Sequence, residues 1–505
     1  MSALKKTILP GLAVVAWLAM LAECTPSSKP GLPHSSPFSE FPPLVQGVAT
    51  GDVTNQSALV WFRTEGPART QVEWAPITDA LPGASPSGSA AWTGRSALMT
   101  TSREHDFTTT VRLDGLKSAT VYRYRVLTAY VDGTDFEKAR REAMTGRFRT
   151  ASAPDRSGEV LFIWSGDLGG QQRCRREPSG YAIFERIRQA APHFALLLGD
   201  LIYGDDPCTS PPNASGSDFV ATTLEAYRAK HRYQREDKAL QRLLAEVPVY
   251  AMWDDHEVRN NFAGPFEPLM PVGRQALLEY WPIGTPPDDP HRLYRKFRWG
   301  ANLELFILDT RQYRSRNADP DGLNKTMLGA AQRDWLIDGL TQSTATWKVI
   351  ATSIPLSVPK AGNFLVPGND SWARGPDGTG FQTELQRIVD AILGRNIGNV
   401  VWLATDVHFA QVNAYDPDAD GATDFHEFIA GPLSAAPGKL VSPNPIFRPT
   451  TLFGETGFSN FGRVTIKGGT LTLELVDESG HVRFTHAVQA RKDRGLAMEG
   501  RQRVR

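Results

Sequence analysis

The sequence predicts a layered α/β domain that follows an all-β sandwich, and three observations support this. Six continuous apolar segments lie in the middle of the chain, helical patterns separate several of them, and short alternating segments precede them. Continuous apolar segments are typical of strands buried on both faces of a parallel sheet, whereas alternation indicates half-exposed strands. With 505 residues, the chain also exceeds what one hydrophobic core usually contains.

The chain begins with the features of an export signal. Lys5 and Lys6 precede a short apolar stretch at residues 8–22. This arrangement is typical of a signal peptide, and the stretch is too short to predict a membrane span. We therefore expect a signal peptide at residues 1–23, a Ser/Pro-rich tether at residues 24–42, and a mature protein in the periplasm or outside the cell.

The end of this signal leaves membrane attachment open. The segment Leu21–Cys24 resembles a bacterial lipoprotein box, in which the cysteine is acylated, but Glu23 stands where a small residue is usual. A lipid anchor at Cys24 and simple cleavage nearby are therefore two open interpretations.

Residues 43–151 are expected to form the all-β sandwich. Strict alternation with turn residues between the segments indicates antiparallel strands. The segment LDGLKSATVYRYRV resembles the tyrosine corner of fibronectin-type sandwiches, in which Tyr122 or Tyr124 would fold its hydroxyl back onto the backbone.

Residues 152–488 are expected to form the α/β domain. Helical patterns occur at residues 180–190, 329–343 and 381–395, and alternation at residues 462–488 indicates additional antiparallel strands. Residues 223–246 resemble one long charged helix, which we interpret as a solvated lid or insertion. The last residues, 489–505, are expected to be a frayed tail.

The six apolar segments end on polar side chains. They span residues 160–170, 194–206, 247–257, 303–314, 347–355 and 400–408, and only the fifth lacks a terminal carboxylate or histidine, with Ser353 instead. Ligands of open α/β sheets bind outside the carboxyl ends of the strands, so these groups should converge on one rim. The converging residues would be Asp167, Asp200, Asp254, Asp255, His256, Asp309, Asp406 and His408. Crowded carboxylates repel one another unless cations lie between them, so the pattern predicts a metal site.

Two cysteines remain after the signal, Cys174 and Cys208, each a few residues beyond a predicted strand end. In an oxidising compartment, two neighbouring thiols normally form a disulfide, which is the interpretation that we favour. The alternative is that Cys174 is a soft thiolate ligand of iron or zinc.

Several motifs, in their order along the chain, resemble those of a known family. GVATGDVTNQSALVWFRT, SGDLGG, GDLIYGDD, MWDDHEVRNN, LDTRQYR and ATDVH resemble the PhoD-type alkaline phosphatases of the calcineurin-like metallophosphoesterase superfamily, over residues 43–485. GDLG and GDLIY are also similar to motifs of purple acid phosphatases. The resemblance implies a four-layer αββα sandwich after a fibronectin- or Ig-like domain. The best-known PhoD branch has a cysteine at the end of its first strand, where this chain has Gly166-Asp167, so cysteine ligation of iron does not transfer by position.

The resemblance implies two or more metal ions. Asp200 would bridge two of them, Asp167, His408 and Tyr203 would complete the first site, and Asp255 with Asp406 would hold the second. A phenolate ligand requires a strongly acidic ion, so Fe³⁺ is expected in the first site, and the oxygen-rich second site favours Ca²⁺. Zn²⁺, Mn²⁺ and Mg²⁺ are the alternatives, and Tyr203 could instead be a rim tyrosine hydrogen-bonded to a carboxylate.

Two further residues are candidates for catalysis. His256 could protonate the leaving oxygen, hold a phosphoryl oxygen, or only orient a carboxylate. Arg311 has the planar fork that suits phosphate, and its alternative role is a salt bridge to Asp309. Cys174, Asp254 and Asn260 are additional ligand or supporting candidates, and Arg314 is a weaker one. Four histidines outside the motifs are expected to be structural or exposed: His193, His231, His426 and His481.

These expectations together describe an exported hydrolase of small phosphate esters, acting as a monomer by direct attack of a metal-bound hydroxide. Lys+Arg and Asp+Glu both number 55, so net charge offers no attraction to nucleic acid, which is expected only as a substrate if at all. Hydrolysis of phosphomonoesters at alkaline pH, which would supply phosphate, has a close rival in hydrolysis of phosphodiesters or phospholipids. A catalytically silent surface-binding protein is the alternative from another class, and it would predict eroded ligand positions.

Overall fold

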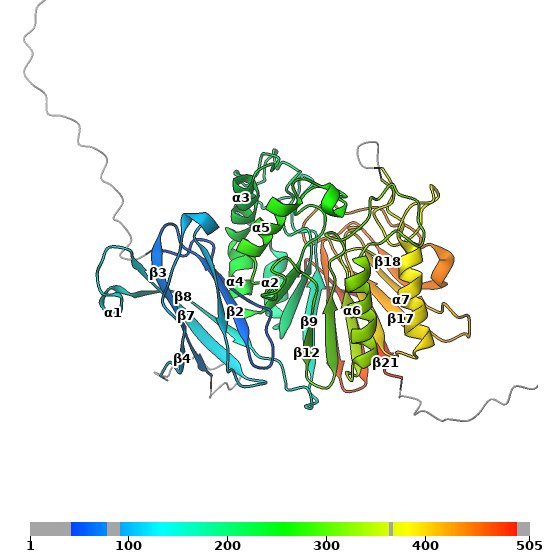
Figure 1. Cartoon of the computed structure of the whole chain (residues 1–505), viewed down its shortest axis with the longest axis horizontal. Coiled ribbons are helices and arrows are strands. Elements are labelled where there is room, and N and C mark those ends of the chain that lie inside the picture. Colours follow the sequence, from blue (N-terminus) through cyan, green and yellow to red (C-terminus); the bar gives the residue numbers. More distant parts are fainter. Residues whose placement is uncertain (1–41, 78–90, 363–366, 492–505) are drawn as a thin grey trace, which may run out of the picture. The chain divides into compact units, whose positions relative to one another are not determined.

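Two large β-sheets pack face to face, and helices cover their outer faces (Figure 1). The computed structural model describes residues 42–77, 91–362 and 367–491. The predicted signal peptide, Cys24, almost all of the tether, and residues 492–505 of the tail therefore lie outside the described residues. No helix in the described ranges is long and apolar enough to cross a membrane.

The first large sheet has nine strands. Its order is β21 (Val482–Gln489), β20 (Thr470–Asp477), β19 (Asn460–Lys467), β9 (Val160–Ser165), β10 (Phe194–Leu198), β11 (Val249–Met252), β1 (Val48–Gly51), β2 (Ala58–Arg63) and β6 (Thr108–Leu113). β9, β10, β11 and β1 run parallel to their neighbours within this group.

The second large sheet has seven strands. Its order is β12 (Arg295–Trp299), β13 (Leu303–Ile307), β14 (Trp347–Ala351), β15 (Val400–Ala404), β17 (Phe425–Ile429), β16 (Ala410–Tyr415) and β18 (Pro449–Glu455). β13, β14, β15 and β17 are parallel. All six continuous apolar segments therefore form strands, and they are divided equally between the two sheets.

The layers follow from which side chains each sheet buries. Alternate residues such as Phe162 and Leu196 meet Leu305 and Val349 between the sheets. The outer face of the first sheet packs on α2 (Ile183–Gln189), α4 (Lys238–Glu246) and α5 (Met270–Tyr280), and that of the second on α6 (Gly329–Gln342) and α7 (Gln382–Gly394). The four-layer αββα prediction is confirmed, although α5 was not expected.

The N-terminal strands form the predicted sandwich. A third sheet contains β4 (Gly94–Arg95), β3 (Ala68–Pro76), β7 (Val121–Tyr130) and β8 (Arg141–Arg149), with β5 (Met99–Thr100) also paired to β3, while α1 (Phe136–Ala139) packs on β7. It packs on β1, β2 and β6 around an apolar core. The Lys117 N–H donates to the Tyr122 hydroxyl at 2.9 Å, so Tyr122 forms the tyrosine corner.

The sandwich shares a sheet with the α/β domain. β1 pairs in parallel with β11 at Gly51 and Val249, on either side of the boundary expected near residue 151. The Asp52 carboxylate next to β1 accepts two hydrogen bonds from Arg295, at 2.8 and 3.0 Å. β11 leads directly into Asp254 and Asp255, so the sandwich supports a strand that carries predicted metal ligands.

The prediction of one long, solvated helix at residues 223–246 is wrong in two respects. The segment is broken into α3 (Leu224–Arg235) and α4, because the Asp237 carboxylate accepts the Leu240 N–H at 2.8 Å and begins a new helix. Nor is it a solvated lid, because several of its charged side chains are buried: Arg228 pairs with Glu279 at 2.7 Å, and Arg235 lies 3.9 Å from the ring centre of Trp61. These partners neutralise or cover the charges, so a charged helix can be buried.

Candidate metal centre

The predicted ligands lie directly after strands of both sheets. Asp167 follows β9, Asp200 follows β10, and Asp406 and His408 follow β15. All four residues have positive φ, between 52° and 72°, which is uncommon for side chains other than glycine and clusters at functional sites. The backbone therefore turns sharply at each strand end and places these side chains at one rim.

The rim residues form three overlapping groups. Within each group, one potential ligand atom per residue lies within 4.8 Å of the others, and the groups are Asp167, Asp200 and His408; Asp200, Asp255 and His256; and Asp254, Asp255 and Asp406. Asp200 and Asp255 each belong to two groups, and Asp200 is the one that links Asp167 and His408 to Asp255, which is the position expected of a bridging carboxylate. Six of the eight residues expected at the rim were predicted as metal ligands or as the catalytic histidine, and the structure brings those six together.

Several carboxylate oxygens at the rim are buried without a hydrogen-bond partner in the described residues. They are Oδ2 of Asp167, Asp254, Asp370 and Asp406, and Oδ1 of Asp255. Burial, together with the neighbouring aspartates, raises the pKa of Asp167 and of Asp200 well above the usual range. Buried charges of one sign are stable only with compensating cations, so these oxygens fit metal ions.

His408 is oriented as a metal ligand. Its Nδ1 lies 2.6 Å from the carbonyl oxygen of Ala436, which can only accept, so Nδ1 carries the proton and Nε2 keeps its lone pair. Nε2 lies 3.2 Å from the Tyr203 hydroxyl and 3.8 Å from an oxygen of Asp167. Burial lowers the pKa of His408 to about 4, which keeps the ring neutral at physiological pH.

Tyr203 is buried beside the same group. Its ring stacks on His256 with 4.3 Å between the ring centres. Burial and the nearby Asp200 raise the pKa of the Tyr203 phenol well above its ordinary value. Without a strongly acidic ion the side chain is therefore a neutral phenol, and within the described residues its hydroxyl is hydrogen-bonded to His408 rather than to a carboxylate.

His256 faces the cavity and is held by a residue that the sequence reasoning missed. Its Nδ1 lies 2.6 Å from Asp205 Oδ1, and the other oxygen of Asp205 accepts the Asn260 N–H at 2.7 Å. Burial alone would lower the pKa of His256, but Asp255 and Asp205 raise it to about 9. Asp205 lies in the GDLIYGDD motif, five residues after the bridge, which was the available signal.

Arg311 does not face the cavity, so its predicted phosphate contact is wrong. The side chain is fully buried, with Nε 2.6 Å from Asp254 and Nη1 2.8 Å from Asp370. Nor does it pair with the Asp309 side chain as the alternative proposed, since only its backbone N–H reaches that carboxylate. Arg311 instead supports the ligands from behind, together with Arg314, which also contacts Asp370.

Asp309 and Asp254 also differ from expectation in detail. Asp309 turns away from the rim, where its carboxylate accepts Trp253 Nε1 at 2.8 Å and the backbone N–H groups of Arg311 and Gln312. It therefore fixes the turn after β13. Asp254 stays at the rim, but one oxygen is bound by Arg311 and by the Ser353 hydroxyl at 2.7 Å.

Lys360 is the most prominent residue that the sequence analysis missed. Its Nζ contacts Asp406 and lies 3.7 Å from oxygens of both Asp255 and Asp370. Glu257 is a third residue that was missed: its carboxylate accepts the N–H groups of Asp200, Leu201 and Asp254 and so connects β10 to β11. Lys360 lies in a proline-flanked loop without any strand-end pattern, so nothing in the sequence marked it.

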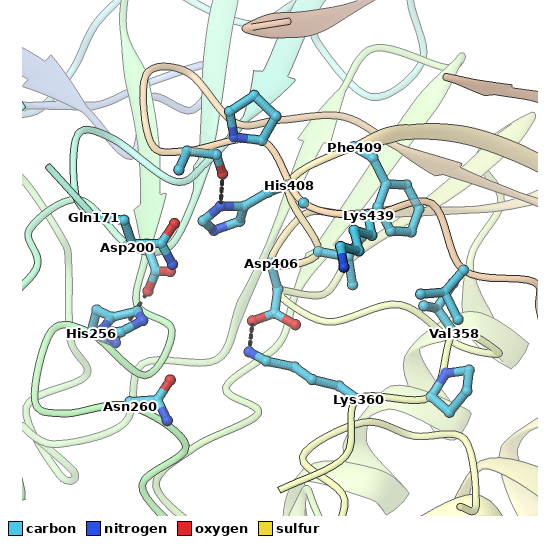
Figure 2. A pocket seen from close by; sticks show the side chains of 16 residues that line it. Gln171, Asp200, His256, Asn260, Val358, Lys360, Asp406, His408, Phe409 and Lys439 are labelled. Atoms are coloured by element: carbon cyan, nitrogen blue, oxygen red, sulfur yellow. Dashed lines mark hydrogen bonds and ion pairs between the residues drawn. The ribbon is translucent and has the colours of Figure 1, made fainter. Parts of the chain in front are cut away.

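A cavity of about 280 Å³ opens onto this rim. Figure 2 shows Asp200, His256 and Asn260 on one side, Asp406 with Lys360 in the middle, and Phe409 with Val358 on the other side. The lining is thus polar at the carboxylates and apolar away from them. Among the described residues that line it, none carries a hydroxyl or thiol side chain.

Cys174 and Cys208 form a disulfide, as favoured, which leaves no thiolate at Cys174 to bind a metal. The bond joins the loop after β9 to the loop after β10, which carry Asp167 and Asp200. The four histidines expected to be structural or exposed lie outside the three groups. His193 stacks on Trp299 and His231 on Tyr280, His426 packs against His486, and the His481 side chain is 79% exposed.

Comparisons with known proteins show which family this chain resembles. The model of the family described as PhoD-like phosphatase matches residues 170–455, more than half of the chain, and that of the PhoD-like phosphatase N-terminal domain matches residues 31–152. Alkaline phosphatase D of Bacillus subtilis (strain 168) is 29% identical over 329 residues, which cover 59% of this chain and 52% of that relative. The chain thus aligns with about half of the relative's length.

Two solved structures share the fold. The structure of PhoD superposes with a TM-score of 0.71 at 22% identity, over 91% of this chain and 95% of that one. Purple acid phosphatase PPD1 from yellow lupin (Lupinus luteus) gives a TM-score of 0.59 at 14% identity, over 89% and 74% of the two chains.

Proposed function

Because the chain belongs to the PhoD-like phosphatase family, we propose that it hydrolyses phosphate esters at a centre of two metal ions. The observation that carries this proposal is the set of buried carboxylate oxygens without hydrogen-bond partners in the described residues, which converge from the ends of β9, β11 and β15. A purely structural cluster would pair these oxygens internally, as other buried carboxylates of this chain do.

The residues present suit two different ions. Asp167, Tyr203 and His408 would hold the first, Asp255 and Asp406 the second, and Asp200 both. We propose Fe³⁺ in the first site, because a phenol as buried as Tyr203 ionises only beside a strongly acidic cation, and Ca²⁺ in the oxygen-rich second site. Such a pair supplies Lewis acidity, which activates water and offsets the charge of the phosphoryl group.

The side chains around the ions have separable tasks. His256, held by Asp205, faces the cavity as a donor to the leaving oxygen or to a phosphoryl oxygen. Lys360 places a positive charge beside Asp255 and Asp406 of the second site. This charge would offset part of the negative charge that an anionic substrate adds. The described lining has no hydroxyl or thiol side chain, which supports attack by water over a covalent intermediate on serine, threonine or cysteine.

A specific observation keeps phosphodiesters as a second candidate substrate class. Beyond the carboxylates, the cavity continues along Val358, Phe409 and Val441, with Lys439 beside them. An apolar wall of this kind accommodates a second ester group, and Lys439 could pair with a charged head group. A monoester would leave this side of the cavity filled only by water.

We further propose that the mature chain acts outside the cytoplasm as a monomer that releases phosphate for uptake. The disulfide between Cys174 and Cys208 supports an oxidising compartment. The export signal and the lipid anchor at Cys24 lie outside the described residues and remain predictions from the sequence.

One assay tests the activity and separates the substrates. Metal-loaded protein is offered p-nitrophenyl phosphate, bis(p-nitrophenyl) phosphate and a phosphatidylcholine at alkaline pH, before and after metal removal. We expect turnover of the monoester, its loss on chelation, and recovery when metals are returned. Faster turnover of either diester would assign the second class, and no metal-dependent turnover of any ester would contradict the proposal.

A further inference from the structure

A second group of carboxylates lies far from the metal centre, in the turn between β16 and β17. The turn follows Tyr415 and ends at Phe425, which pairs with Val400 at the start of β15. The metal centre lies beyond the opposite end of β15, after Ala404. The whole length of this strand therefore separates the two groups.

The sequence of this turn has the spacing of a calcium-binding loop. The segment DPDADGATD, at residues 416–424, places aspartates at positions 1, 3, 5 and 9 and a glycine at position 6. In such loops, positions 1, 3 and 5 supply carboxylates, position 7 supplies a carbonyl oxygen, and the glycine allows the sharp turn. Gly421 has a φ of +89°, the conformation in which glycine is favoured.

The turn is folded so that its carboxylates face one another. Asp416 accepts the N–H groups of Asp420 and Gly421, both at 3.1 Å. One oxygen from each of Asp416, Asp418 and Asp424 lies within 4.8 Å of the others. A cavity of about 350 Å³ lies beside them, lined by Asp418, Asp420 and Asp424 and by residues at the C-terminal end of α7.

Asp424 supplies the independent indication of a ligand. Its side chain is only 8% exposed, and its Oδ2 is buried with no hydrogen-bond partner in the described part of the chain. The other oxygen lies 3.3 Å from Arg491, so only one of the two is compensated. A buried carboxylate oxygen without a partner costs free energy unless a cation binds it.

We propose that this turn binds one Ca²⁺ through Asp416, Asp418, Asp420 and Asp424 and the carbonyl oxygen of Ala422. Hard oxygen donors without nitrogen or sulfur suit Ca²⁺, and its flexible coordination tolerates an irregular turn better than the strict octahedron of Mg²⁺. The open cavity leaves room for water to complete the coordination.

The affinity should be low, because the twelfth position does not contribute. Glu427 stands there, but its carboxylate points to the opposite side, where it accepts Asn413 Nδ2 at 3.0 Å and the Tyr415 hydroxyl. Without this bidentate ligand, we expect a dissociation constant of about 10⁻⁴–10⁻³ M, as in extracellular calcium modules. The site would then be filled where Ca²⁺ is millimolar.

Calcium counting on the full-length, metal-loaded protein tests this site. At about 2 mM free Ca²⁺, the wild type should bind one more Ca²⁺ per chain than Asp418→Ala, with hydrolysis unchanged within about twofold. Asp155→Ala, which removes a carboxylate that is 77% exposed in another turn, is the matched control and should bind as the wild type does. Ca²⁺ should also slow cleavage of the wild-type turn by a protease that cuts before aspartate at residue 424.

A metal-centre variant keeps this test independent of the proposed function. Asp200→Asn should lose hydrolysis and still bind Ca²⁺ at the turn, with the same protection from cleavage. If the wild type and Asp418→Ala bind equal amounts of Ca²⁺ and are cleaved at equal rates, the turn is not a calcium site. If the double variant Asp200→Asn/Asp418→Ala binds as much Ca²⁺ as Asp200→Asn alone, the ion that Asp418→Ala loses belongs to the metal centre, and the proposal is overturned.

Discussion

Two regions of this protein bury acidic side chains, and they differ in whether basic side chains neutralise the negative charges. Next to the sandwich, Asp106 accepts bonds from Arg63 at 2.9 Å, from Arg232 at 2.5 Å and from the Tyr280 hydroxyl. Within the sandwich, Glu73 is paired with Arg125, Arg140 and Arg95.

Among the described residues, two aspartates at the rim, Asp167 and Asp200, have no arginine partner of this kind. Burial opposes ionisation of the carboxylates in both regions. The arginines nevertheless hold the pKa of Asp106 and of Glu73 below the usual range. At the rim, neighbouring aspartates add to the effect of burial and raise the pKa of Asp167 and of Asp200. The two regions are therefore distinguished by whether the protein itself completes the charge, and not by the number of carboxylates. Incomplete compensation is what indicates a ligand.

The largest effect should come from Asp200→Asn. The neutral amide cannot bridge two cations, so hydrolysis should fall by about 10³-fold or more, and the bound metal should decrease. The folded metal-free chain should not become less stable, because the change removes repulsion from Asp255. Turnover and elemental analysis check this, and near-normal turnover with full metal content would contradict the assignment of the bridge.

Asp106→Asn should show the opposite pattern. Removing the charge leaves Arg63 and Arg232 incompletely paired in a buried position, so the free energy of unfolding should fall by about 3 kcal/mol while hydrolysis is retained. Asp114→Asn is the control, because Asp114 is 63% exposed and pairs with an exposed arginine. Denaturant unfolding measures both, and equal effects would remove the distinction between the regions.

His231 is a buried basic side chain near the sandwich whose positive charge, if it formed, would have no partner. Neither ring nitrogen has a partner in the described residues, and burial, with help from Arg235, lowers the pKa of His231 to about 3. The fold therefore excludes a proton that the unfolded chain binds below about pH 6.5, so stability is present above that pH and is lost as the pH falls towards 3.

His231→Phe should keep the stacking on Tyr280 and remove this titration. The loss of stability between pH 7 and pH 5 should be smaller in the variant by about 2 kcal/mol. Part of the acid sensitivity should remain, because burial also lowers the pKa of His193 and His426 to about 4. Parallel stability curves for the two proteins would show that His231 is already protonated in the fold.

Tyr203→Phe should have the smallest effect on turnover, about tenfold or less, because the phenol tunes the metal and does not deliver the nucleophile. The informative measurement is colour. A phenolate bound to Fe³⁺ absorbs visible light, so concentrated wild-type protein should be coloured and the variant colourless. A colourless wild type that is fully active with only zinc or calcium would contradict the iron proposal and leave the two-metal centre intact.

The sequence predicted the strand ends because they depend on local pattern. A continuous apolar segment that ends on a carboxylate specifies both a buried strand and the rim to which it leads, so Asp167, Asp200, Asp255, Asp406 and His408 were identified together. The direction of each side chain is a different matter. Arg311 was expected in the cavity, but Asp254 and Asp370, which are remote in sequence, turn it to the back of the rim.

Long-range partners explain the other differences. Lys360 has no periodic context, and its amine is positioned by carboxylates from three other segments. The break at Asp237 depends on a tertiary contact as well as on its helix cap, since its second oxygen accepts the Tyr181 N–H at 2.9 Å. Propensity alone could not separate that residue from the charged residues around it.

The pairing of β1 with β11 has a consequence for how the polypeptide matures. Without residues 42–77, β11 would be the last strand on its side of the sheet, and its backbone groups would be open to pairing with other molecules. During synthesis β1 is made before β11, so the complementary strand is already present when β11 emerges. The N-terminal sandwich therefore covers the edge of β11, the strand that leads into Asp254 and Asp255. Expressing the α/β domain alone would expose this edge to pairing with other molecules.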